Sequence, residues 1–427
     1  MEIVVPDLSH LSEEAFSDAA VEFLEANASL KAEEQAFVWG EGDDNASLFD
    51  DPDREAEQRD LAAAKAWRAK KYDAGFGWIS GPVEMGGSGC PRGHEAIWSR
   101  LEAKYDAPSA GFFGIGLGMV APTIAAHGNP EVAADLLPKM YRGDLVGCQL
   151  FSEPGAGSDL ASLQMKAERD GEEWIINGQK VWTSGAHYSD VGEIIARTDF
   201  DMPKHRGLTG FMVDMHAPGV EVRPLRQMTG GANFNEVYFT DVRVPDSHRL
   251  GDLNQGWAVA LTTLMNERAS IGGGGGGDSR GGGITRLTEM ARAMGKLDNA
   301  NVRQRLMKIF TYNKVLSYTN QRAMAGLAAG KTPGPEMSLA KMGLTRSMRA
   351  QVHYVSEVLG PRLIADTGEW GTFSNAGFVL GEPGMHIAGG SDEVMRNIVG
   401  ERVLGLPKEP GIDTTSPFKD ITVGTQR

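Results

Sequence analysis

The chain has 427 residues, of which 41% are hydrophobic and 23% charged, an ordinary balance for a globular protein. Its formal net charge of -15 predicts repulsion from phosphate backbones and anionic lipid, which argues against nucleic-acid and membrane partners. No apolar run approaches the roughly 18 residues of a membrane span, and no secretory signal pattern precedes the first helical segment. Cys90 and Cys148 have no CxxC spacing, and no zinc-type Cys/His spacing occurs, so we expect free thiols, no metal and a cytoplasmic location.

Residues 1–146 predict an N-terminal helical domain. The segment EAEQRDLAAAKAWRAKKYDAG is rich in Ala, Lys and Arg, carries Leu61, Trp67 and Tyr72 as larger apolar groups, and meets a stop signal at Gly75. The segment GFFGIGLGMVAPTIAAHG predicts an apolar helix interrupted by glycines.

Residues 147–253 predict a small β-domain. The segment DGEEWIINGQKVWTSG has β-prone runs on both sides of Asn177-Gly178, and we expect a hairpin turn there because both residues tolerate positive φ. Further β-prone runs follow, with turn residues between them: VGEIIART, GLTGFMVDM, GVEVRPL and NEVYFTDVRVP.

Residues 254–427 predict a C-terminal helical domain resembling a four-helix bundle. Met348, Val352, Val355 and Leu359 follow one another at helical spacings of four, three and four. The order of helices, strands and helices predicts an α+β fold.

The segment CQLFSEPGAGSD, Cys148–Asp159, predicts a strand that enters a glycine-rich turn. Backbone N–H groups in such a turn can converge on an anion or on the polar edge of a flat ring, and Ser152 and Ser158 add hydroxyl donors. An ordinary β-turn is the alternative. The segment GQKVWTSGA places Trp182 and Ser184 two residues apart, on one face if the chain is extended. An aromatic group beside a small donor suits a planar cofactor, and a core Trp with a surface Ser is the alternative.

These two segments, together with AGGSDEVMRNIVGERVLGLP near the C-terminus, closely resemble the acyl-CoA dehydrogenase family over about residues 60–408. The resemblance implies the acyl-CoA dehydrogenase fold, FAD in a cleft between the β-domain and the C-terminal helices, and a homotetramer or homodimer. It implies flavin contacts from three places, namely Gln149, Phe151, Ser152, Gly157 and Ser158, then Trp182, Thr183 and Ser184, and finally Ser391 and Glu393. Ser158, Arg268 and Gly389 are the implied substrate contacts.

Family chemistry needs one carboxylate as base, and medium-chain members carry it in a YEGT sequence. The matching residues here are Ala388 to Ser391, with Gly389 at the position of the base. Isovaleryl- and long-chain-type members keep the base in an earlier Glu-Arg pair, which matches Glu267-Arg268. The resemblance therefore implies that Glu267 is the catalytic base, with a pKa raised by burial.

Two segments depart from the family pattern. The RxxFG region, whose Arg reaches the FAD of a neighbouring subunit, reads GKLDNANVRQRL here, with Arg303 and Arg305 as possible substitutes. The QxxGG sequence reads EVLGP, which places Glu357 and Gly360 at this part of the FAD site. An anionic Glu near FAD is a poor replacement for an amide unless it is protonated or paired, so a heteromeric assembly stays an alternative.

The segment NERASIGGGGGGDSRGGGI, Asn266–Ile284, contains nine glycines in nineteen residues. A flexible linker and a phosphate-binding loop are alternatives, but a dinucleotide loop needs a preceding strand and helical residues precede this run. Because a linker would leave Glu267 on a frayed end, we expect a helix, or a helix that opens into a glycine-rich turn. Residues without side chains would widen the acyl pocket, which suits bulky, branched or cyclic groups.

The sequence therefore predicts a cytoplasmic FAD-dependent acyl-CoA dehydrogenase that forms a 2,3-enoyl-CoA and passes electrons to an electron-transfer flavoprotein. Two alternatives stay open. One is a family offshoot such as an oxidase, monooxygenase or desulfinase, and the other is an inactive subunit of a heteromeric enzyme.

Overall fold

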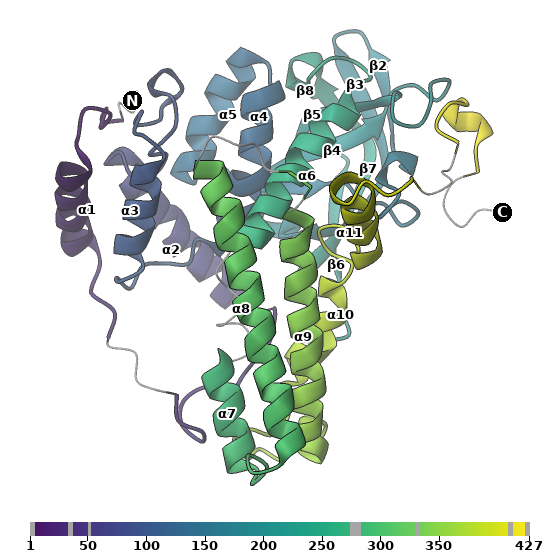
Figure 1. Ribbon diagram of the computed structural model, residues 1–427. Coiled ribbons are helices and arrows are strands. Elements are labelled where there is room, and N and C mark those ends of the chain that lie inside the picture. The colour runs from purple at the N-terminus through teal and green to yellow at the C-terminus, as the bar shows by residue number, and fades with distance from the viewer. Residues whose placement is uncertain are drawn as a thin grey trace.

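The computed structural model describes residues 5–32, 37–49, 53–273, 283–328, 334–335, 337–408 and 413–422. Helices come first along the chain, a β-sheet follows, and helices return after it (Figure 1). This order confirms the predicted α+β fold class. Within the described part of the chain, no helix has the length and apolarity needed to cross a bilayer.

The N-terminal helices begin at well-formed caps. The Ser12 side chain accepts a hydrogen bond from the Ala15 N–H, and the Asp53 side chain accepts one from the Ala56 N–H. The elements are α1 (Glu13–Asn27), α2 (Arg54–Asp73), α3 (Gly93–Glu102), α4 (Ala121–His127) and α5 (Pro130–Arg142), with 3-10 turns η1 (Val83–Met85) and η2 (Gly111–Phe113). Gly75 follows α2 at φ +89°, as the stop signal predicts.

The glycines of GFFGIGLGMVAPTIAAHG coincide with departures from regular α-helix, in the 3-10 turn η2 and in a π-helical turn. A π-helical turn, η3 (Gly116–Val120), runs directly into α4. A Cβ atom on Gly116 would lie 3.0 Å from the Gly147 nitrogen. Gly116 therefore permits close contact between the helical segment and the first strand, and the glycines interrupt the α-helical geometry while the chain stays helical.

One eight-stranded sheet follows, in which β1 pairs with β4 beside the path β6-β7-β3-β2-β4-β5-β8. The β1–β4 and β2–β4 pairs are parallel, and the other pairs are antiparallel. The strands are β1 (Gly147–Leu150), β2 (Lys166–Asp170), β3 (Glu173–Ser184), β4 (Val191–Arg197), β5 (Leu208–Asp214), β6 (Val220–Leu225), β7 (Phe234–Pro245) and β8 (Arg249–Leu250). Three 3-10 turns, η4 (Leu160–Ser162), η5 (Ala186–Tyr188) and η6 (Asp246–His248), lie between strands.

The Asn177-Gly178 pair lies within β3, so the hairpin predicted at this pair is wrong. The turn from β2 to β3 instead uses Gly171, at φ +64°. Gly178 has φ +146° at a register shift opposite β7, and the Asn177 Oδ1 accepts a hydrogen bond from the Asp241 N–H at 2.9 Å. The positive φ that the sequence signals is therefore used in a β-bulge rather than in a turn.

The C-terminal helices pack along the sheet and extend beyond it (Figure 1). They are α6 (Gly256–Gly273), α7 (Gly283–Ala293), α8 (Ala300–Ala328), α9 (Met337–Leu359), α10 (Ala376–Met385) and α11 (Asp392–Ile398), with short turns η7 (Gly360–Leu363), η8 (Val399–Val403) and η9 (Phe418–Asp420). Met348, Val355 and Leu359 are buried along α9, in agreement with the predicted apolar stripe. The end of the bundle that contains α7 lies away from the sheet in Figure 1.

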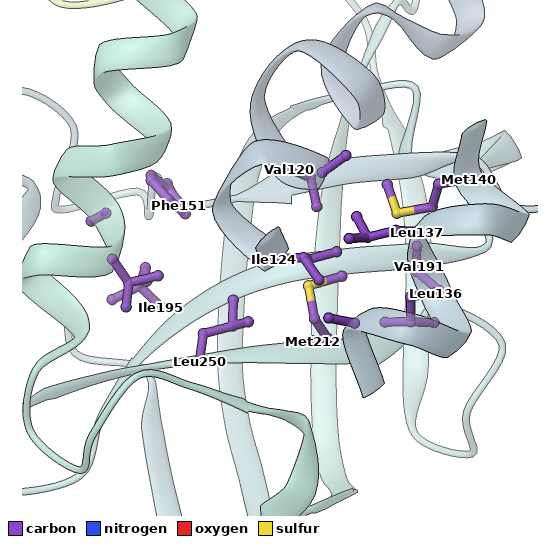
Figure 2. Close-up of a cluster of buried hydrophobic side chains, with 14 of the residues drawn as sticks. Val120, Ile124, Leu136, Leu137, Met140, Phe151, Val191, Ile195, Met212 and Leu250 are labelled. Atoms are coloured by element: carbon purple, nitrogen blue, oxygen red, sulfur yellow. The ribbon is translucent and has the colours of Figure 1, made fainter. Parts of the chain in front are cut away.

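An apolar core joins the N-terminal helices, the sheet and α6, and we call it the central core (Figure 2). Val120, Ile124 and Leu137 from the helical side meet Ile195 and Met212 from the sheet. Phe151 also belongs to it, as do Val259 and Ala260 of α6. Full burial of each large apolar side chain stabilises the fold by about 1.5–3 kcal/mol, so this core fixes α6 against the sheet. Cys90 and Cys148 are buried and free, as predicted.

Candidate active site

The turn after β1 presents its backbone to open space. The Glu153 N–H donates to the Ala156 carbonyl at 3.0 Å, and the Ala156 N–H donates back to the Glu153 carbonyl at 3.0 Å. Gly155 and Gly157 have no heavy atom within 4 Å of the place where a Cβ would lie. A tight turn with one open side is the geometry that an anion or a ring edge requires. Ser158 is exposed beside it, whereas Gln149 and Ser152 are half-buried and Phe151 is buried.

A buried ion pair locks this turn to β3. Lys180 is 0% exposed, and its Nζ donates to the Phe151 carbonyl at 2.9 Å and to the Glu153 carboxylate at 2.9 Å. Glu153 also accepts the backbone N–H groups of Gln164 (2.7 Å) and Met165 (3.0 Å). Burial lowers the pKa of Lys180, and the Glu153 carboxylate opposes that shift. The two sequence segments thus form one rigid unit.

Trp182 stands on strained backbone next to this unit. Its φ is +63°, an unusual value for a bulky residue, and its side chain is 53% exposed. The β3–β7 register shifts between Lys180 and Thr183, so the expectation of regular extended chain from Trp182 to Ser184 is wrong. Strain of this kind gathers at functional sites, and an exposed indole offers a flat surface to a planar ring.

Thr183 and Ser184 complete the segment. Ser184 is half-buried, whereas Thr183 is only 1% exposed and its Oγ1 has no hydrogen-bond partner among the described residues. A buried hydroxyl without a partner is costly unless a ligand supplies one. The Asn235 side chain donates to the Thr183 carbonyl at 3.0 Å, which fixes the backbone at this point.

Glu267 lies on α6, a helix that contacts β4 and β5 of the sheet as well as α8 and α9. It is half-buried, and Leu264, one turn earlier, packs against the central core. Gly272 and Gly273 belong to the same helix, so α6 continues past Glu267, as expected. Residues 274–282, which contain the rest of the glycine run, and the side chain of Arg268 lie outside the described part of the chain.

The AGGS segment leads into α11. Gly389 has φ +64° and Gly390 has φ +89°, the left-handed region that favours glycine. Ser391 is the N-cap of α11, and its side chain accepts a hydrogen bond from the Val394 N–H at 3.2 Å. Glu393 is exposed and pairs with Arg396 at 3.0 Å. A glutamate at 389 would have to adopt strained backbone, which fits the absence of the base there.

A buried polar network lies beneath the AGGS segment. The Asp392 carboxylate accepts from the Lys341 Nζ at 2.9 Å and contacts the His386 Nδ1 at 2.6 Å. The His386 Nε2 contacts Glu382 at 2.6 Å. Although burial acts to raise it, the hydrogen bonds from Lys341 and His386 hold the pKa of Asp392 below its ordinary value. This network ties α9, α10 and α11 together around residues 388–391.

Glu357 and Gly360 lie at the other end of the bundle, near α7, and the structure does not bring them to the glycine turn within one chain (Figure 1). Glu357 is paired, because its carboxylate accepts from the Arg305 Nε at 2.7 Å. Arg303 donates to the Leu297 carbonyl (3.2 Å) and to the Asp298 carbonyl (2.6 Å). Both arginines considered as phosphate ligands thus have partners inside the chain.

Sequence reasoning missed two features of this region. The first is the ion pair between Glu153 and Lys180, whose members lie in separate segments. The second is Glu193, a fully buried carboxyl group on β4. The sequence held a signal for it, since VGEIIART places one acidic residue inside an otherwise apolar run.

Comparison with known proteins places these features in a family. Three models match in chain order, described as the N-terminal domain (residues 46–144), middle domain (148–242) and C-terminal domain (254–404) of acyl-CoA dehydrogenase. The chain is 36% identical to acyl-CoA dehydrogenase IpdE1 of Mycobacterium tuberculosis over 81% of this chain and 88% of that protein. It is 41% identical to FadE34 of the same organism over 67% of this chain, but it spans only 39% of that protein's length.

Solved structures agree with this assignment. The Tcur3481-Tcur3483 steroid ACAD aligns with a TM-score of 0.70 and 26% identity, over 96% of this chain and 100% of that one. The ChsE4-ChsE5 complex from Mycobacterium tuberculosis aligns with a TM-score of 0.65 and 26% identity, over 94% and 100%.

The residues present also fit the family's cofactor. The open glycine turn, the exposed Trp182 indole and the unpartnered Thr183 hydroxyl are what a flavin edge and face would cover. The chain therefore belongs to the acyl-CoA dehydrogenase family, whose members are FAD-dependent oxidoreductases acting on CH–CH bonds.

Proposed function

We propose that the protein oxidises an acyl-CoA thioester to its trans-2,3-enoyl-CoA, with Glu267 as the base that takes the α-proton. Two features together carry this proposal: Glu267 is half-buried on α6, and position 389 is a glycine with a left-handed backbone. One position offers a half-buried carboxylate, and the other disfavours any side chain. When bound, FAD supplies the acceptor for the hydride that leaves the β-carbon.

The chain's own residues divide the remaining work. We assign the hold on the flavin to the glycine turn, to the Trp182 segment and to the start of α11, through Gln149, Phe151, Ser152, Gly157, Ser158, Trp182, Thr183, Ser184, Ser391 and Glu393. We assign substrate contacts to Ser158, Arg268 and Gly389. The Glu267 carboxylate accepts the α-proton, a step that a positioned base typically accelerates by about 10²–10⁴-fold.

We infer a bulky, cyclic or branched acyl group as the substrate. Two observations support this. The structurally similar Tcur3481-Tcur3483 protein is titled a steroid ACAD, and α6 ends in glycines just after Glu267. The electron acceptor that we propose is an electron-transfer flavoprotein. The two buried free thiols are in keeping with a cytoplasmic protein.

A second chain is part of this proposal. Glu357 and Gly360 lie at the far end of the bundle, so a contact with FAD would have to be made with the flavin of another subunit. Because Arg303 and Arg305 are engaged inside the chain, an unlike partner subunit is an alternative to the homotetramer or homodimer. The ChsE4-ChsE5 structure is itself a complex of two differently named chains. An inactive role in such a pair is the second candidate function.

The test is an anaerobic screen of purified protein with acyl-CoA thioesters, from butyryl-CoA to thioesters with ring-bearing side chains. We expect yellow protein, loss of flavin absorbance with the bulky substrates, and a product two mass units lighter. Oxygen consumption during turnover would instead indicate an oxidase or monooxygenase. Colourless protein that gains FAD only with a partner chain would favour the heteromeric alternative. No flavin under any condition would refute the proposal.

A further inference from the structure

Glu193 is a buried carboxyl group on β4. This strand pairs with β1 and contacts α6, the helix that carries the proposed base. Glu193 is 0% exposed, and its register partners are Gln149 on β1 and Met212 on β5. Because side chains alternate along a strand, Glu193 shares a face with Val191 and Ile195, which belong to the central core of Figure 2. Glu193 therefore points towards the layer that contains α4 and α6.

Three oxygen contacts connect Glu193 to two helices. Its Oε1 lies 2.6 Å from the Thr263 Oγ1 on α6. The Thr263 Oγ1 lies 2.8 Å from the Thr123 Oγ1 on α4, which in turn lies 2.9 Å from the Met119 carbonyl in η3. The alternative acceptor for Thr263, the Val259 carbonyl, is farther away at 3.3 Å. The chain thus runs from β4 through α6 to α4.

The number of protons needed for these three hydrogen bonds determines whether the Glu193 carboxyl group is protonated. The Met119 carbonyl can only accept, so the Thr123 hydroxyl donates to it. The contact between the two threonines then uses the Thr263 proton. The remaining contact, between Thr263 and Glu193, needs a proton from Glu193 itself. All three contacts are satisfied together only when Glu193 is a neutral acid.

The second carboxyl oxygen supports the same state. Glu193 Oε2 is buried and has no hydrogen-bond partner among the described residues. An unpartnered oxygen is far more costly in a carboxylate than in a neutral acid. Burial raises the pKa of Glu193 to about 8.

No charged group among the described residues forms an ion pair with Glu193. The titratable groups on the elements around it are Glu267 and Arg268 on α6, His127 on α4, Cys148 on β1 and Asp214 on β5, together with Arg197 at the end of β4 itself. The side chain of Arg268 lies outside the described part of the chain, and the Arg197 guanidinium donates to the carbonyls of Ala161, Leu163 and Lys204. The His127 Nε2 contacts the Thr262 hydroxyl at 2.8 Å, and Asp214 is exposed at the end of its strand. No described cation therefore compensates a negative charge at 193.

We propose that Glu193 is a positioning residue, a neutral acid that anchors through Thr263 the turn of α6 preceding Glu267. Thr263 and Glu267 are four residues apart, so their side chains lie one above the other on the same helical face. The chain of hydroxyls fixes this turn against β4 and α4. Hydrogen bonds are directional, so they define the position of the turn more closely than an apolar contact would. This role rests on the proposed assignment of Glu267.

The test compares Glu193→Gln, Glu193→Leu and Thr263→Val in the FAD-loaded protein. We expect kcat of the wild type to decline at alkaline pH, where Glu193 ionises and the anchor breaks. Glu193→Gln mimics the neutral acid, so we expect it to retain most of kcat at pH 7 and to lack this decline. Glu193→Leu and Thr263→Val break the anchor, and we expect kcat to fall by up to about 100-fold with FAD content and KM little changed.

A second readout does not depend on Glu267. Thermal stability is measured from pH 5 to 9 in wild type, in Glu193→Gln and in both again with Glu267→Gln. The wild-type Tm should fall, relative to Glu193→Gln, as pH rises towards about 8, in both backgrounds. If Glu267 is not the base, this difference persists while the kcat effects vanish. Identical pH profiles for wild type and Glu193→Gln, or a Gln variant as impaired as the Leu variant, would overturn the proposal.

Discussion

Replacing Lys180 by Met should destabilise the protein strongly, because it removes one member of the buried pair that joins β3 to the glycine turn after β1. Lys180 is 0% exposed, and Glu153 is 9% exposed. Breaking a buried pair costs about 3–5 kcal/mol, since the remaining charge loses its compensation. Glu153 keeps two backbone N–H donors, from Gln164 and Met165, so we expect a loss near the lower value, about 3 kcal/mol.

The measurement is urea unfolding followed by tryptophan fluorescence, with FAD content determined in parallel. The matched control is Lys166→Met on the neighbouring strand, where the pair with Glu168 at 2.8 Å is 46% and 62% exposed. An exposed pair contributes about 0–1 kcal/mol, so the control should be nearly neutral. Glu153→Gln added to Lys180→Met should recover part of the loss. Equal, small effects of Lys180→Met and Lys166→Met would refute the role of the buried pair.

Three further predictions concern other parts of the site. Because the pKa of Glu193 rises from 4.5 to about 8 on folding, its contribution to stability is complete below about pH 4.5. The free energy of unfolding then falls by up to about 5 kcal/mol as pH rises to about 8, and the Glu193→Gln variant should lack this decrease. Gly389→Ala should cost about 1–2 kcal/mol in the same unfolding assay, because Gly389 has φ +64°, and an unchanged midpoint would contradict the left-handed conformation. Gly273→Val should reduce activity on ring-bearing acyl-CoA more than on butyryl-CoA, and equal losses would argue that the glycines at the end of α6 do not shape the pocket.

The order of helices, strands and helices could be predicted from sequence, because periodicity is a local signal. The flavin role of the two segments rests instead on the family resemblance, since their residues alone are equally compatible with an ordinary turn and a core tryptophan. The Asn177-Gly178 bulge could not, since the same positive φ serves a turn or a bulge and only pairing with β7 decides between them. The left-handed φ of Trp182 was equally hidden, because the strain is imposed by tertiary context. Glu193 was visible as an acidic residue in an apolar run, but its partners on α4 and α6 are distant in sequence.

The role of Glu267 is tested most directly by mixing the FAD-loaded Glu267→Gln variant, under anaerobic conditions, with an acyl-CoA that the wild-type protein oxidises. The control is Glu131→Gln, an exposed carboxyl at the start of α5. We expect the Glu267 variant to retain FAD and to bind the thioester, while flavin absorbance declines about 10²–10⁴-fold more slowly than in wild type and in the control. Bleaching of the variant at the wild-type rate would contradict the assignment of Glu267 as the base.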